Sequence, residues 1–244
     1  MDLKETIDIN ANRHPWETAR LKALQEILGP RIREGVKVLD VGCGDGFISK
    51  SLFGHLHNKE ITAVDINLSN ELMRTLNSSN SCINYQSEMP EDGFYDLILL
   101  LDVIEHVEYD QSFLTGIAKK YLAENGTIII TAPAFQSLYG RHDVFLEHYR
   151  RYNLSELVML TAACNLNVLF SGYLFFSLLF PKYVLYKLLN LSKESEGVGN
   201  WRRGIAFTNI VVSILNLDNK ILITASQFGI KIPGLTGWVL CEKQ

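Results

Sequence analysis

Short apolar runs alternate with stretches of helical periodicity along the first two thirds of the chain. The apolar runs have the length and aliphatic content of β-strands, and they span residues 36–41, 60–65, 83–85, 95–101 and 126–132. The intervening stretches place apolar side chains at helical spacing and predict helices over residues 16–28, 46–56, 69–77 and 112–122. Several strands are apolar on both faces, as in parallel sheets that helices cover on both sides. The pattern therefore predicts an α/β fold with a mostly parallel sheet.

The last third of the chain breaks this alternation. Asn153 and Glu156 have the spacing of a capping box and predict a helix start, and further strands are expected at 165–172 and 237–243. Between these strands lie two apolar stretches, separated by a segment rich in glycine, serine and glutamate. We interpret residues 174–232 as an inserted helical lid or subdomain between the last two strands. The main domain then consists of residues 1–173 and 233–244.

One uncharged run bears on where the protein acts. Residues 168–180 carry no charge, but the run is shorter than the roughly 20 residues that a membrane-spanning helix needs. A buried strand that runs into a helix is the simpler interpretation. A peripheral membrane contact through residues 168–190 is the alternative. The apolar helices of the insertion could also form a homodimer interface.

Composition limits the classes of function. The 244 residues are 47% hydrophobic, which allows a sizeable core, and the net charge of -4 argues against a nucleic-acid-binding protein. The four cysteines are far apart and predict neither a zinc site nor a disulfide framework. The first residues are charged and lack the apolar segment of a signal peptide. We therefore expect a cytoplasmic protein.

The strongest chemical signal is the sequence VLDVGCGDG, in which a strand ends at Asp40 and runs into closely spaced glycines. Glycines at the carboxyl end of a strand let the backbone approach a ligand closely. Phe47 stands where a dinucleotide-binding fingerprint needs a glycine, and the acidic surroundings disfavour phosphate. Asp65, at the end of the next strand, is placed to accept hydrogen bonds from ribose hydroxyls. S-adenosylmethionine fits these features because it carries a ribose and a sulfonium but no phosphate.

The segments VLDVGCGDG, VDIN, FYDLILLLDVIEHV and NGTIIITAP together resemble the class I S-adenosylmethionine-dependent methyltransferases. The resemblance implies a Rossmann-like seven-stranded sheet whose last strand is antiparallel, with helices on both faces. It implies a cofactor site made of Trp16, Arg20, Asp40, Gly42, Cys43, Gly44, Asp65, Ile66, Gln86, Leu101 and Asp102. In this site Asp40 would lie near the methionine ammonium and Gln86 near adenine. Trp16 and Arg20 would cover the cofactor, unless Trp16 is a core residue and Arg20 a solvated one.

The stretch HDVFLEHYRRY follows the fifth predicted strand, at the sheet edge where ligands bind in such folds. A hydroxyl acceptor needs a base, and histidine is the usual one, so His142, Asp143 and His148 are the catalytic candidates. The stretch also resembles a segment of bacterial methyltransferases encoded among cell-envelope glycan genes. A segment for helix capping and packing is the alternative. His106, after the fourth strand, is expected to be a local hydrogen-bond partner.

These features predict an enzyme that transfers a methyl group to oxygen in a small-molecule or glycan-type acceptor. A quinone or another lipid-like acceptor is an alternative that the apolar insertion favours. A non-catalytic protein that only binds the cofactor is a further alternative, which the intact glycine motif disfavours. No metal dependence is expected, because no cluster has metal-ligand spacing apart from His142, Asp143 and His148.

Overall fold

The computed structural model describes residues 13–79, 82–184, 201 and 203–243. It contains one seven-stranded sheet with the strand order β3-β2-β1-β4-β5-β7-β6. The strands are β1 (Val36–Val41), β2 (Lys59–Val64), β3 (Ile83–Gln86), β4 (Tyr95–Leu101), β5 (Leu122–Pro133), β6 (Leu166–Leu174) and β7 (Thr236–Lys243). β7 runs antiparallel to both neighbours, and the other pairings are parallel. The predicted fold class is confirmed.

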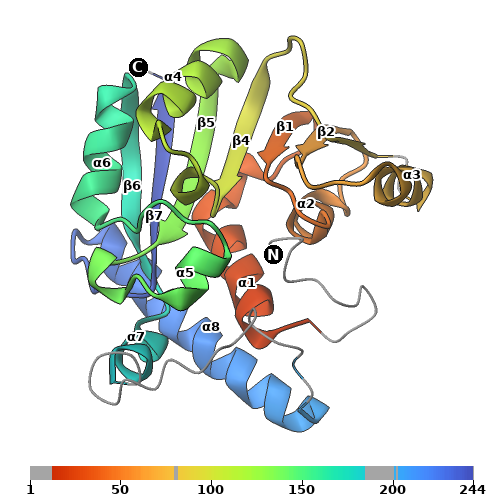
Figure 1. Cartoon of the computed structure of the whole chain (residues 1–244). Helices are drawn as coiled ribbons and strands as arrows, with labels where there is room; N and C mark the ends of the chain where they lie inside the picture. Colours follow the sequence, from red (N-terminus) through yellow and green to blue (C-terminus); the bar gives the residue numbers. More distant parts are fainter. Residues whose placement is uncertain (1–12, 80–81, 185–200, 202, 244) are drawn as a thin grey trace.

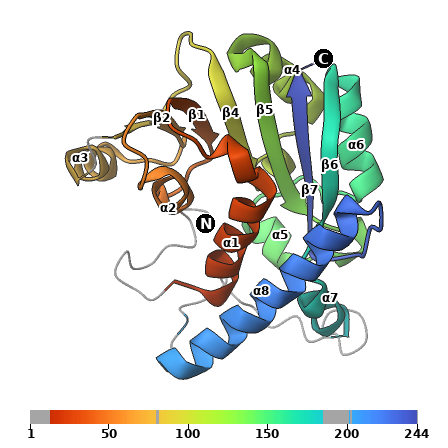
Figure 2. The same ribbon diagram turned by 180° about the vertical axis from the view of Figure 1, so that it is seen from behind.

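The helices are α1 (Pro15–Leu28), α2 (Phe47–Phe53), α3 (Asn70–Ser79), α4 (Asp110–Tyr121), α5 (Arg141–Phe145), α6 (Leu154–Ala163), α7 (Phe176–Tyr183) and α8 (Ile205–Gln227), with 3-10 turns η2 (Gly29–Arg31), η3 (Ile104–His106) and η4 (Gln136–Leu138). α4 and α6 cover one face of the sheet, and α1, α2 and α8 cover the other, as the two opposite views show (Figures 1 and 2).

β4 contributes side chains to the hydrophobic cores on both faces of the sheet. Leu97, Leu99 and Leu101 belong to the core beneath α1 and α8, whereas Ile98 and Leu100 belong to the core beneath α4 and α6. Successive side chains of a strand point to opposite faces, so a strand buried on both sides must be apolar throughout. This is why an uninterrupted aliphatic run was a reliable strand signal here.

The expected insertion contains α7 and α8, which lie between β6 and β7 in sequence. α8 packs along α1 and β6, and its Asn219 accepts a hydrogen bond from the Phe175 amide at 2.9 Å. α8 is long and apolar enough to cross a membrane by length and composition alone, and 17% of its apolar window is buried. Residues 185–200 of the insertion, and with them the end of the suggested membrane-contact segment, lie outside the described residues.

Candidate functional site

A cavity of about 560 Å³ opens at the carboxyl ends of β1, β2, β4 and β5. Its wall draws on α1, on the loops after these strands, on η3, on the segment around α5 and on α7. Seven of the predicted cofactor residues lie in the wall, namely Trp16, Arg20, Gly42, Asp65, Ile66, Leu101 and Asp102. The cavity therefore lies at the sheet edge that the strand order and the glycine motif predicted.

The glycine loop after β1 adopts backbone conformations that suit glycine. Gly42, Gly44 and Gly46 all have positive φ angles, of 72°, 56° and 74°. A Cβ atom on Gly42 would lie 2.6 Å from Cγ2 of Val103, and one on Gly46 would overlap the Tyr85 hydroxyl. These glycines therefore meet both a backbone and a packing requirement.

Asp65 holds the glycine loop and also faces the cavity. Its carboxylate accepts hydrogen bonds from the amides of Gly44 and Asn67, each at 2.9 Å, and it is 9% exposed. Ile66 beside it is 86% exposed, so an apolar surface lies next to a carboxylate in the cavity wall. An acceptor for ribose hydroxyls next to an apolar platform is the pairing that an adenosine group needs.

Four of the predicted cofactor residues lie outside the cavity wall: Asp40, Cys43, Gly44 and Gln86. Asp40 is buried beneath the loop, where it accepts a hydrogen bond from the Ser49 hydroxyl at 2.6 Å, and burial raises its pKa to about 6. Cys43 is also buried, which raises the pKa of its thiol. Gln86 contacts Asp65 through its backbone carbonyl, and Met89 lines the wall instead.

Arg20 on α1 is fixed at the inner end of the cavity. It is 4% exposed, forms an ion pair with Asp102 at 2.8 Å and donates to the Thr131 hydroxyl at 2.8 Å. Its guanidinium lies 5.0 Å from the ring centre of Trp16, which packs against Phe175. The alternative of a solvated Arg20 is therefore wrong. Asp102 itself has a positive φ of 58°, a strained conformation of the kind that concentrates at functional sites.

The segment around α5 carries a buried polar network. Asp143 accepts hydrogen bonds from the Gly140 amide at 2.9 Å, His148 Nδ1 at 2.9 Å and Arg151 Nε at 2.8 Å. Although burial opposes its charge, the hydrogen bonds from His148 and Arg151 hold the pKa of Asp143 far below its usual value. The charged carboxylate orients His148 with Nδ1–H toward it, which leaves Nε2 as a proton acceptor.

In this segment His142, Leu146, Glu147, His148 and Arg151 line the cavity, and Asp143 holds His148 and Arg151 from behind. Burial lowers the pKa of His142. Arg150 turns away and pairs with Asp110 at 3.0 Å. The segment thus forms part of the cavity wall. Its short helix α5 contains His142 and Asp143, whereas His148 and Arg151 lie in the loop that follows.

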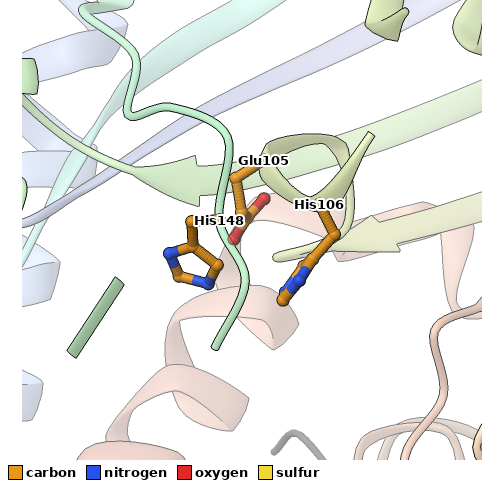
Figure 3. Close-up of side chains that lie close together, drawn as sticks. All are labelled: Glu105, His106 and His148. Carbon is orange, nitrogen blue, oxygen red and sulfur yellow. The ribbon is translucent and has the colours of Figure 1, made fainter. Parts of the chain in front are cut away.

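Glu105 and His106 were not predicted as site residues, yet both line the cavity opposite His148. Figure 3 shows the Glu105 carboxyl and the two imidazole rings facing one another, and the His106 and His148 rings are 4.5 Å apart at 87°. Burial and the neighbouring Asp102 raise the pKa of Glu105 well above its usual value. One atom from each of the three side chains lies within 4.8 Å of the others, close enough for the group to hold a proton or a metal ion.

α7 contributes Leu178 and Lys182 to the wall. Burial and the nearby Arg151 lower the pKa of Lys182 to about 8. Tyr173, at the end of β6, is buried and stacks on Phe135, and it does not line the cavity. The part of α7 that faces the cavity is therefore the side that carries Leu178 and Lys182.

Comparisons with known proteins agree with this geometry. A family described as a methyltransferase domain matches residues 12–170. The ubiquinone biosynthesis O-methyltransferase of Rickettsia conorii is 39% identical over 102 residues, which cover 39% of this chain and 34% of that protein. The match thus spans about a third of the length of this relative.

Two solved structures share the fold over nearly the whole chain. Coclaurine N-methyltransferase, bound to N-methylheliamine and S-adenosylhomocysteine, has a TM-score of 0.58 at 18% identity and covers 98% of this chain and 76% of its own. The N-methyltransferase NodS of Bradyrhizobium japonicum, in complex with S-adenosylhomocysteine, has a TM-score of 0.56 at 12% identity and covers 99% and 94%. The chain belongs to the methyltransferase-domain family and has the class I methyltransferase fold.

Proposed function

We propose that this enzyme methylates a hydroxyl group of a small-molecule or glycan-type acceptor. The observation that carries the proposal is the hydrogen bond between Asp143 and His148, because His148 lines the same cavity as Asp65 and Ile66. A methyl group on a sulfonium is already activated, so the protein has to align the two reactants and remove the hydroxyl proton. His148 is placed for the second task because its Nδ1 is occupied by Asp143.

In the bound state S-adenosylmethionine supplies an electrophilic methyl group. Methyl transfer would then form a C–O bond to the acceptor oxygen as the S–C bond breaks, with the electron pair left on sulfur. The hydroxyl proton passes to His148 Nε2, and Asp143 stabilises the resulting imidazolium. Arg151 keeps Asp143 charged and in place, since it donates to the same carboxylate oxygen as His148.

We propose that Asp65 and Ile66 hold the adenosine part of the cofactor and that Arg20 lies at its methionine end. The support for Asp65 and Ile66 is their adjacency in the wall, one as an acceptor and the other as an exposed apolar surface. The support for Arg20 is its fixed position beside Asp102 at the end of β4. Titration with S-adenosylmethionine tests these roles variant by variant.

We propose that α7, within the interpreted lid of residues 174–232, closes the acceptor side of the site. Leu178 and Lys182 reach the cavity, whereas Phe180 on the same helix is 72% exposed. Replacing Leu178 and Lys182 together by alanine should raise the KM for the acceptor at least tenfold and leave the cofactor Kd within twofold. Phe180→Ala is the matched control and should change neither quantity. An unchanged acceptor KM in the double variant would remove α7 from the acceptor site.

The decisive experiment for the reaction is transfer of a labelled methyl group from S-adenosylmethionine to candidate hydroxyl compounds. His148→Gln should lower kcat by a factor of about 10²–10⁴, the usual effect of losing a positioned base. It should keep cofactor affinity, because His148 follows β5, which two strands separate from β2 and Asp65. Transfer to nitrogen or carbon acceptors, with no hydroxyl compound methylated, would contradict the proposal.

A quinone-type acceptor is the second candidate. The matched relative is named for ubiquinone biosynthesis, and the cavity wall of this chain includes the apolar residues Val103, Val107 and Phe113. Hydroquinones with short and long apolar tails, compared with glycosides of equal hydroxyl number, distinguish the two acceptor classes. A non-catalytic protein would instead bind S-adenosylmethionine stoichiometrically and transfer no methyl group in either series.

A further inference from the structure

Three side chains at the acceptor end of the cavity bring together ligand atoms of the metal-binding type. Glu105 and His106 come from η3, and His148 comes from the loop after α5. One atom from each lies within 4.8 Å of the others (Figure 3). Two imidazole nitrogens and one carboxylate oxygen are a donor set that divalent first-row transition ions accept.

The burial of Glu105 is an independent sign of a missing partner. Glu105 is fully buried, and within the described part of the chain neither carboxyl oxygen has a hydrogen-bond partner. A buried carboxyl group without a partner is unfavourable by a few kcal/mol. Such a group is found where a proton, a ligand or a cation interacts with it. The side chain of Glu105 faces the two imidazoles of His106 and His148.

The surroundings of His148 match the support that metal-bound histidines receive. Metal-ligating imidazoles commonly donate their second N–H to a carboxylate, which fixes the ring and raises its basicity. Asp143 fills this position at 2.9 Å from His148 Nδ1, and Arg151 and Gly140 fix Asp143 in turn. The free ring nitrogen, Nε2, is then the ligand atom.

The charges that face the cluster leave room for a cation. Arg20 is paired with Asp102 at 2.8 Å, and Arg151 is paired with Asp143 at 2.8 Å, so each arginine is compensated. Lys182 also lines the cavity, where its charge would oppose a metal ion. The carboxyl group of Glu105 supplies the charge that a metal site needs.

We infer that Glu105, His106 and His148 form a binding site for a divalent transition-metal ion, for which zinc is the best-matched probe. Zinc binds imidazole and carboxylate groups at about 2.0–2.2 Å, so small side-chain rotations would close the present spacing. Three protein ligands leave a position open for another oxygen, as in catalytic zinc sites.

The role of the metal ion in methyl transfer rests on the proposed function. A hydroxyl group of the acceptor takes the open position, and the cation lowers its pKa so that the proton leaves to water. The oxygen then forms the C–O bond as described above. With the metal bound, His148 acts as a ligand, and the direct proton transfer to its Nε2 belongs to the metal-free protein only.

Metal binding can be measured without any acceptor. The full-length chain, in a Cys82→Ser background that removes an exposed thiol, is treated with a chelator and titrated with Co²⁺ and Zn²⁺. We expect one ion per chain and a visible Co²⁺ spectrum of the intensity given by low-coordinate sites. Glu105→Gln and His148→Gln should each weaken binding at least tenfold. Asp143→Asn should weaken it by about 10- to 100-fold, the usual effect of losing the outer carboxylate.

His142→Gln is the matched control, since His142 is a histidine of the same cavity outside the cluster. It should keep the wild-type metal affinity, and all variants should keep their affinity for S-adenosylmethionine as a check of folding. Failure of the wild-type protein to bind either ion at micromolar concentration would overturn the inference, as would equal affinities in all variants. Metal-free protein that methylates hydroxyl acceptors at full rate would leave the proposed function standing without the metal. Metal binding without transfer to any hydroxyl compound would support the metal site and contradict the proposed function.

Discussion

Replacing Asp40 by asparagine should stabilise the protein at neutral pH, because the buried carboxyl carries an unfavourable charge. Burial raises its pKa to about 6 from an ordinary value of 3.8. A raised carboxyl pKa means that the folded state binds the proton more tightly, so stability falls as pH rises between about 4 and 6. At about 1.4 kcal/mol per pH unit, the penalty above pH 6 is about 3 kcal/mol. Asparagine keeps the shape and can still accept the hydrogen bond from Ser49.

The assay is urea unfolding followed by tryptophan fluorescence, without cofactor, at pH 7.5 and pH 4.5. Asp40→Asn should raise the free energy of unfolding by about 1–3 kcal/mol at pH 7.5 and by no more than about 1 kcal/mol at pH 4.5, where the folded carboxyl is already protonated. The matched control is Asp92→Asn, an exposed position at which no pH-dependent difference is expected. A variant that is less stable than the wild type at pH 7.5 would refute the reasoning.

Three further predictions concern the cofactor and the base. Asp65→Ala should weaken S-adenosylmethionine binding by about 10- to 150-fold in a calorimetric titration, since a charged acceptor of two hydroxyls contributes about 1.5–3 kcal/mol; an unchanged Kd would show that Asp65 is not the ribose ligand. Gly46→Ala should abolish cofactor binding or folding because its Cβ would overlap Tyr85, whereas Gly116→Ala on α4 meets no atom within 4 Å and should be tolerated; a Gly46→Ala protein with normal affinity would contradict the packing argument. His148→Gln should lower kcat while the Kd for S-adenosylmethionine stays unchanged, and an unaltered kcat would place the base elsewhere.

The sheet could be predicted from the sequence because each of its central strands is buried on both sides. β1 and β4 have the bounds that the aliphatic runs predicted, Val36–Val41 and Tyr95–Leu101. Such runs identify strands that are covered on both faces, because nearly all of their side chains are buried whichever face they are on. The glycine loop could also be predicted from the sequence. At Gly42 and Gly46 the positive φ and the close approach of neighbouring side chains both require glycine.

Side-chain direction was harder to predict than strand position. Asp40 lies near the end of β1 as expected, yet its carboxyl points beneath the loop to Ser49 instead of lining the cavity. Gln86 ends β3, one residue beyond the predicted strand, yet Met89, three residues later, reaches the wall. Sequence spacing gives the position of a residue along an element, but neighbouring elements decide where its polar group finds a partner.

The two halves of the cavity differ in how the sequence encodes them. The cofactor half depends on short local segments, such as residues 40–46 and 65–66, so a motif of a few residues identifies it. The acceptor half joins Glu105 and His106 to His148 and Lys182, from three segments that no motif connects. A glutamate and a histidine after a strand have an ordinary interpretation as local hydrogen-bond partners, and only the fold places His148 opposite them. Substitutions in the three acceptor segments can therefore alter the acceptor without disturbing Asp65 and the glycine loop, and acceptor choice should be sought there.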